Sequence, residues 1–213
     1  MGAAMMDISR YGDLKKLPNT PAAKILLQGN AVLQTRLDAP ASASIAEVLA
    51  ELDAKGAVID MLQRLAHSLP AREATWWACL SARDILAEDA PLPASLRAAE
   101  AWVYQPGVES RTRARAALDN AGNEDDTFLC AMAASFADGT LGPGDLEDYE
   151  APRGAVGGAV FGMALMSLFH DEEQVGTRGP LLLARALDIA RGGRGHASSN
   201  AVGSSSPGSE AMS

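Results

Sequence analysis

The sequence predicts an all-α fold with about six to eight antiparallel helices stacked as αα-hairpins. Hydrophobic residues make up 47% of the chain and aromatic residues only 5%, so the core must consist mainly of Ala, Leu, Val and Met, of which Ala and Leu are strong helix formers. Apolar residues recur at helical spacing between residues 44 and 191. Short turns rich in Gly and Pro separate these segments, which favours antiparallel neighbours. Because no strict repeat period is present, a helical-repeat-like array and a compact orthogonal bundle both remain open.

Residues 1–40 are expected to form an extended N-terminal arm. Gly and Pro residues interrupt this region and leave room for only a short helix near 22–28. The apolar side chains of the arm can either pin it across the helical domain or dock it onto a partner, and pinning is the simpler expectation. The arm has no continuous apolar stretch behind a basic start, so the sequence predicts no secretory signal.

The helical domain is expected to span residues 41–191. Ser44 and Glu47 form a capping box, in which the hydroxyl and the carboxylate each satisfy a free amide at the helix start. Downstream, Gly and Pro residues end or restart successive helices. The first expected helix begins at Ser44 and ends at Gly56, and the second contains Val58 to Leu69. The third runs over about 71–87, the fourth contains Leu96 to Val103, the fifth runs over about 110–121 and the sixth contains Phe128 to Phe136. The last two run over about 155–169 and 181–191. Large side chains are expected on the inner face of the sixth helix, namely Phe128, Leu129, Met132 and Phe136.

Two segments stand apart from the helices. Residues 138–154 contain several Gly and Pro residues and an acidic run at 145–150, and they are expected to form an exposed acidic loop. Loops of this length are uncommon in compact helical domains and are often functional. Residues 192–213 are rich in Gly, Ser and Ala, with little apolar content to offset the entropy of ordering, so they are expected to form a disordered tail.

The acidic balance of the chain argues against nucleic acid as a partner. The formal net charge is -9 and the pI is about 4.8, whereas nucleic-acid phosphates are bound mainly by clustered Lys and Arg. The nearest approach to a basic patch, formed by Arg111, Arg113 and Arg115, is expected to be a solvated helix face or a contact for an acidic protein. No cofactor or metal is expected, because the sequence lacks a phosphate-binding GxxxxGK[ST] loop and the CxxC and HExxH ligand patterns.

An enzymatic alternative depends on Cys79 and His67. The two residues lie on successive helices and could meet across the turn as nucleophile and base. No separate orienting carboxylate or oxyanion loop is apparent, and His67 is instead expected to place a partial positive charge at the C-terminal end of its helix. The sequence therefore predicts that the protein is not an enzyme, with a small cysteine-dependent enzyme as the alternative.

The glycine-rich helix at 155–169 raises a second alternative, peripheral membrane association. Gly158 and Gly162 have the GxxxG spacing that lets helices approach closely in membranes. The uncharged run is shorter than the roughly 20 residues that a bilayer span needs, so a central buried helix is expected instead. Cys79 and Cys130 lie in apolar helical contexts and are expected to be buried free thiols, which suits a reducing, cytoplasmic location.

The adjacent residues Trp76 and Trp77 point about 100° apart on a helix, so both cannot occupy the centre of one core stripe. Trp76 falls on the expected stripe with Cys79 and Leu80. Trp77 is therefore expected at the core boundary, where it either fills a seam between helices or anchors a partner protein. The candidate partner-binding residues are Trp77, Arg72, Glu73, Asp145, Glu147, Asp148 and Tyr149.

The run from His67 to Cys79, HSLPAREATWWAC, resembles an uncharacterised family of small bacterial helical proteins with an LPxREAxWWAC signature. The resemblance implies an association with type VI secretion loci and a role as an accessory or effector-loading protein, with no catalytic residues to transfer. The prediction is therefore a non-enzymatic protein–protein interaction module, an adaptor or chaperone, whose partner is another protein such as a secretion-system component or effector.

Overall fold

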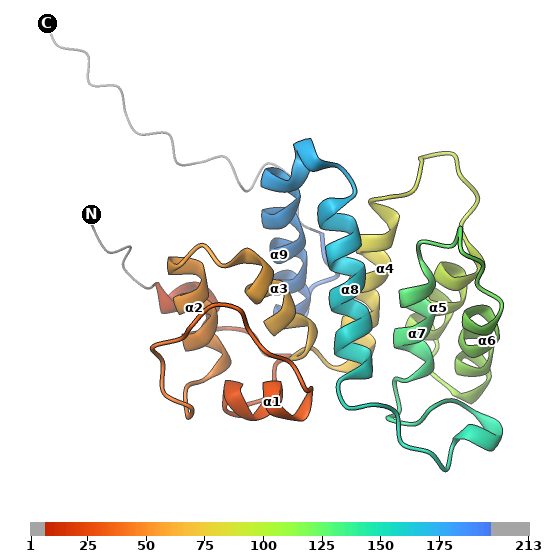
Figure 1. Cartoon of the computed structure of the whole chain (residues 1–213), viewed down its shortest axis with the longest axis horizontal. Helices are drawn as coiled ribbons and strands as arrows, with labels where there is room; N and C mark the ends of the chain where they lie inside the picture. The colour runs from red at the N-terminus through yellow and green to blue at the C-terminus, as the bar shows by residue number, and fades with distance from the viewer. Residues whose placement is uncertain (1–6, 197–213) are drawn as a thin grey trace, which may run out of the picture.

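The computed structural model describes residues 7–196 and confirms the all-α fold (Figure 1). Within those residues it contains nine α-helices, three short 3₁₀ turns and one isolated β-bridge. The α-helices are α1 (Ala22–Gln28), α2 (Ile45–Ala54), α3 (Val58–Ala66), α4 (Ala71–Arg83), α5 (Ala94–Tyr104), α6 (Val108–Asp119), α7 (Phe128–Ser135), α8 (Ala155–Phe169) and α9 (Val175–Arg191). The 3₁₀ turns are Ile8–Tyr11, Gly144–Leu146 and Glu172–Gln174.

The helices form a compact bundle around α8. This helix packs against α3, α4, α7 and α9, and α4 in turn contacts α5, α7 and α9. Figure 1 shows α5, α6 and α7 together at one end and α1, α2, α3 and α9 towards the other, with α4 and α8 between them. In a helical-repeat array each unit contacts only its sequence neighbours. Contacts such as α4 with α8 and α3 with α9 join elements far apart in the sequence, so the bundle is the architecture.

The N-terminal arm is pinned to the bundle. Tyr11 and Ile25 are buried in the core, and the Lys16 amide donates to the Ala190 carbonyl of α9 at 2.8 Å. Two buried carboxylates hold the end of the arm. Glu51 accepts hydrogen bonds from two amides at residues 38–39, and Asp60 accepts two more from residues 34–35. Because each carboxylate takes two main-chain donors, the irregular chain is ordered without secondary structure of its own.

The predicted capping box is present at the start of α2. The Ser44 hydroxyl accepts from the Glu47 amide, and the Glu47 carboxylate accepts from the Ser44 amide at 2.7 Å. Two predicted helix ends are wrong. α4 ends at Arg83 rather than 87, and α9 begins at Val175 rather than 181. Pro180 lies inside α9, where its missing amide removes one helix hydrogen bond but does not stop the chain from remaining helical.

The predicted inner face of α7 is also wrong. Its buried residues are small, namely Cys130, Ala131, Ala133, Ala134 and Ser135, whereas the four large residues expected inside are only half-buried. The reason is that α7 contacts α4, α5, α6 and α8. A short helix enclosed on several sides needs small side chains there, and its larger side chains fill the periphery of the contact.

The first residues of the predicted tail lack regular secondary structure but are bound to the helical domain. They are ordered, because the Trp76 indole Nε1 donates to the Arg194 carbonyl at 2.9 Å and the Gly195 amide donates to the Asp188 carboxylate at 2.8 Å. These bonds hold the segment 192–196 against α4 and α9. The rest of the predicted tail, residues 197–213, lies outside the described residues, as do residues 1–6 of the arm.

Candidate functional site: a cleft at the start of α8

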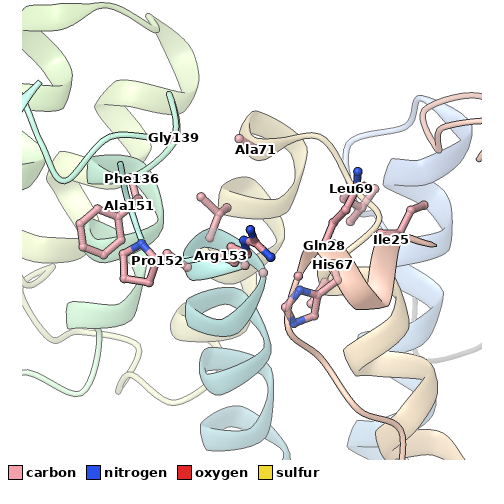
Figure 2. A pocket seen from close by; sticks show the side chains of 16 residues that line it. Ile25, Gln28, His67, Leu69, Ala71, Phe136, Gly139, Ala151, Pro152 and Arg153 are labelled. Atoms are coloured by element: carbon pink, nitrogen blue, oxygen red, sulfur yellow. The ribbon is translucent and has the colours of Figure 1, made fainter. Parts of the chain in front are cut away.

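A cleft of about 370 Å³ opens where the ends of α1 and α3 meet the beginning of α8. Figure 2 shows Ile25, Gln28 and His67 on one side of it and Phe136 on the other, with Arg153 between them. The polar side chains therefore come from three separate segments. The volume lies within the range of small-molecule sites in proteins.

Three glycines and one histidine form the closest contacts in this cleft. Gly154, at φ 73°, approaches the Gly29 carbonyl so closely that no Cβ would fit between them. The His67 ring packs against Gly157 of α8, where a Cβ would also collide with it. At Gly29 a Cβ would lie only 2.6 Å from His67 Nδ1. The absence of side chains at these positions thus allows the imidazole to sit between α1 and α8.

The cleft has a positive electrostatic environment. Its lining residues include Arg153 and no Asp or Glu. Arg64 lies one turn before His67 on α3 and is fully buried, with Nη1 donating to the Ala22 carbonyl at 2.9 Å. Nε and Nη2 of Arg64 have no hydrogen-bond partner within residues 7–196. The start of α8, which has no side-chain cap, adds the positive end of a helix dipole.

The same environment changes the titration of two groups. Burial lowers the pKa of the Arg64 guanidinium to about 10, which leaves it charged at neutral pH. Burial lowers the pKa of the His67 imidazole, and the nearby Arg64 charge lowers it further. His67 is the C-cap residue of α3, as expected, but its lowered pKa disfavours the positive charge expected there, and the ring packs against glycines of the cleft.

The structure does not bring Cys79 and His67 together as nucleophile and base. Cys79 is 0% exposed, and a hydrogen bond with Cys130 together with burial raises the pKa of its thiol well above the ordinary value. His67 lies instead against the glycines of the cleft. A buried, protonated thiol without an adjacent base is a poor nucleophile. The two cysteines are free, as expected.

The predicted positions of the two tryptophans are reversed. Trp77 is 0% exposed and lies in the core, so its assignment as a partner contact is wrong. Trp76 is half-buried and packs against Tyr104 with ring centroids 5.8 Å apart. Periodicity placed Trp76 with Cys79 at i+3, but α4 is enclosed by α5, α7, α8 and α9. The buried arc of α4 is consequently wider than a single stripe and includes both Trp77 and Cys79.

The other predicted residues on α4 lie at the surface and make contacts within the chain. Arg72 is exposed, and its Nε donates to the Val103 carbonyl at the end of α5 at 2.7 Å. Glu73 pairs with Lys16 of the arm at 2.8 Å. Both side chains thus link α4 to neighbouring segments.

The four predicted residues of the acidic loop are exposed. Asp145, Glu147, Asp148 and Tyr149 all reach solvent, and Tyr149 is 60% exposed. They lie on the loop between α7 and α8, which leaves the bundle next to the cleft. The structure therefore separates the predicted partner-binding residues into this loop and the α4 surface.

Arg111 and Arg115 of α6 hold this loop, which corrects their expected role as a solvated face, whereas Arg113 is exposed as expected. Arg111 is buried and pairs with Asp138, and its Nη2 lies 3.6 Å from Glu147. Arg115 donates to the Leu141 carbonyl at 2.7 Å. Residues on the two sides of the loop also bond to each other, since the Leu141 amide donates to the Tyr149 carbonyl at 2.8 Å.

The glycine-rich helix is the central helix that the sequence predicts. None of the described helices is long and apolar enough to span a membrane. Gly158 has open space around it, whereas a Cβ on Gly162 would meet Leu129 of α7 at 3.0 Å. Within residues 7–196, no cluster of His, Cys, Asp and Glu side chains is arranged to hold a metal ion.

Sequence reasoning missed the cleft itself. No sequence motif marks Gln28, Gly29, Arg153 or Gly154 as members of one site. The available signal was the PRGAVGG run, residues 152–158, in which a cation and an uncapped helix start lie together. Its partner residues in α1 and α3 are more than 80 positions earlier, so spacing could not reveal them.

Comparison of the chain with curated proteins and with solved structures gave no match. Residues 48–190 match a family model described as a family of unknown function, DUF6931. The matched region contains α3 to α8 and the HSLPAREATWWAC run, and it agrees with the expected membership of an uncharacterised family. Because this match covers more than half of the chain, the protein belongs to the DUF6931 family.

Proposed function

We propose that this chain is a non-enzymatic adaptor or chaperone that binds another protein in the cytoplasm. We further propose that the partner is a component or an effector of a type VI secretion system. The support for this choice of partner is the resemblance of residues 67–79 to the double-tryptophan signature, and the support for a binding role is the form of the acidic loop.

The main support for the proposal is that the acidic loop is held in one conformation while its acidic side chains are exposed. The chain between α7 and α8 is held at its base by the buried Arg111 and by Arg115, and an isolated bridge joins Thr140 to Glu150. Asp145 and Asp148 take part in none of these bonds. Their exposed side chains extend from a loop whose base is held in place. A loop that is already ordered loses less conformational entropy when a partner binds.

The chemistry of the loop favours a basic partner segment. Its outer residues combine carboxylates with the exposed ring of Tyr149. Carboxylates attract Lys and Arg, and an exposed tyrosine provides apolar contact area with a hydrogen-bonding hydroxyl. The net charge of -9 adds long-range attraction for a positively charged protein.

The test compares two double variants with the same change in charge. Asp145→Asn with Asp148→Asn neutralises the loop, whereas Glu172→Gln with Glu173→Gln neutralises two exposed acids in the turn between α8 and α9. Each protein is immobilised in native lysate from a type VI-positive bacterium, and captured secretion components are quantified by mass spectrometry. Tyr149→Ala is included as a third variant.

We expect the unmodified protein and the 172/173 variant to capture the same secretion component. The loop variant should lose most of this capture, and the loss should be mimicked by raising the salt concentration, because exposed ion pairs are screened. Equal capture by all the proteins would exclude the loop as the binding surface. If the captured proteins include no secretion component, the proposed class of partner is wrong.

A further inference from the structure

The cleft at the start of α8 differs in charge from the rest of the molecule. The chain has 27 acidic and 18 basic residues, yet none of the cleft's lining residues is Asp or Glu. Arg153 is the lining residue with a full positive charge, and it forms no ion pair with the described part of the chain. A planar guanidinium left free at a cleft is suited to bind a carboxylate or a phosphate with two hydrogen bonds.

A second, buried cation lies on α3, one turn before His67, and does not line the cleft. Arg64 is 0% exposed and no acidic side chain forms an ion pair with it in residues 7–196. Two of its donor nitrogens, Nε and Nη2, have no acceptor there. An unpaired buried charge is costly. Because Arg64 does not line the cleft, its contribution to anion binding there is a longer-range attraction from its positive charge.

The side chains of the cleft also provide hydrogen-bonding groups and apolar walls. Gln28 and the neutral His67 ring lie on the α1 and α3 side. Ile25, Leu69 and Phe136 provide apolar surface next to them. A site of this composition suits a small molecule with a short carbon skeleton and an oxyanion at one end.

We propose that this cleft binds a small oxyanion, either the carboxylate of an organic acid or a phosphate group, with the Arg153 guanidinium as its main partner. The Val156 and Gly157 amides in the first turn of α8 and the imidazole of His67 complete the site. The site is separate from the acidic loop surface and does not depend on the adaptor role.

The experiment records amide and imidazole NMR spectra of the full chain during titration with sodium phosphate and, separately, with disodium succinate. Sodium chloride at matched ionic strength serves as the baseline. The variants are Arg153→Gln, Arg153→Lys and, as the matched control, Arg113→Gln. Arg113 is an exposed residue of α6 whose own pairing is with Glu109, four residues earlier. All three substitutions affect exposed side chains, so the fold is retained.

We expect saturable shifts of the Val156 and Gly157 amides with at least one of the two probes. Arg153→Gln should weaken the apparent affinity about tenfold or more, since it removes a charged hydrogen bond. Arg153→Lys should recover part of it, and Arg113→Gln should leave it unchanged. The titration midpoint of His67 should rise when the probe is bound, because a nearby anion favours the charged imidazole.

Saturation by phosphate alone would assign a phosphate-bearing ligand, and saturation by succinate alone would assign an organic acid. Shifts that follow ionic strength, or that are the same in Arg153→Gln and Arg113→Gln, would overturn the site. Equal capture by all the proteins in the adaptor experiment, which would exclude the loop as the binding surface, would leave this result unaffected, so the two proposals fail independently.

Discussion

Trp76 and Trp77 are consecutive residues of α4 with opposite environments. Trp77 is 0% exposed, whereas Trp76 is half-buried, packs against Tyr104 and donates its indole hydrogen to the Arg194 carbonyl at 2.9 Å. One tryptophan of this pair therefore fills the core, and the other joins α4 to the chain that follows α9. Packing within the chain accounts for both side chains before any partner is considered.

The two tryptophans should differ in their contribution to stability. Trp77→Ala is expected to lower the free energy of unfolding by about 3–5 kcal/mol, because it leaves a large cavity in the core. Trp76→Ala should cost only about 1–2 kcal/mol, through partial loss of burial and of one hydrogen bond. Urea unfolding followed by circular dichroism measures both values. Equal losses would contradict the assigned environments.

Gly157 and Gly158 provide a matched pair in the first turns of α8. Gly157→Ala is expected to destabilise the protein by about 1–3 kcal/mol, because the added methyl group overlaps the His67 ring. Gly158→Ala should stabilise it by up to about 1 kcal/mol, since its surroundings are open and Ala is the better helix former. Thermal unfolding of the two variants gives the comparison, and a stabilising Gly157→Ala would show that the ring does not lie there.

His67 should give the stability a specific dependence on pH. Its pKa in the folded protein is lowered from 6.5 by burial and by Arg64. The unfolded chain therefore binds a proton that the folded chain does not. The stability associated with the neutral ring is fully present above about pH 6.5 and is lost as the pH falls towards the folded pKa.

The measurement is the free energy of unfolding between pH 5 and pH 8 in the unmodified protein and in His67→Gln. The variant should show a smaller decrease below pH 6.5. His170→Gln changes an exposed histidine just after α8 and serves as the control, which should keep the slope of the unmodified protein. The same slope in the protein with and without His67 would exclude its role.

The two thiols should be unreactive in the folded protein. Cys79 and Cys130 are both 0% exposed, and the pKa of Cys79 is raised by its hydrogen bond with Cys130 and by burial. Labelling with an aromatic disulfide reagent at neutral pH should therefore be negligible before denaturation and should reach both cysteines after it. Rapid labelling of one thiol in native buffer would contradict this prediction and would support the alternative of a cysteine-dependent enzyme.

The order and kind of the helices could be predicted because they depend on local properties of the chain. The capping box of Ser44 and Glu47 specifies the start of α2, and α8 has the predicted bounds because a long uncharged run begins after Gly154 and ends before His170. The end of α4 and the start of α9 could not be predicted, because neighbouring helices determine how far each continues. The last helix is expected to begin at 181, yet α9 begins at Val175, includes Pro180 and packs against α3 and α8.

The sequence by itself determined that this is an all-α protein with buried thiols and an acidic loop, because helix propensity, apolar spacing and charge act over a few neighbouring residues. Only the tertiary structure decided which tryptophan is buried, that α6 arginines hold the loop, and that Arg153 and His67 share a cleft. Those outcomes depend on how many helices surround each side chain and on contacts between segments far apart in the chain. Neither can be predicted from the spacing of neighbouring residues.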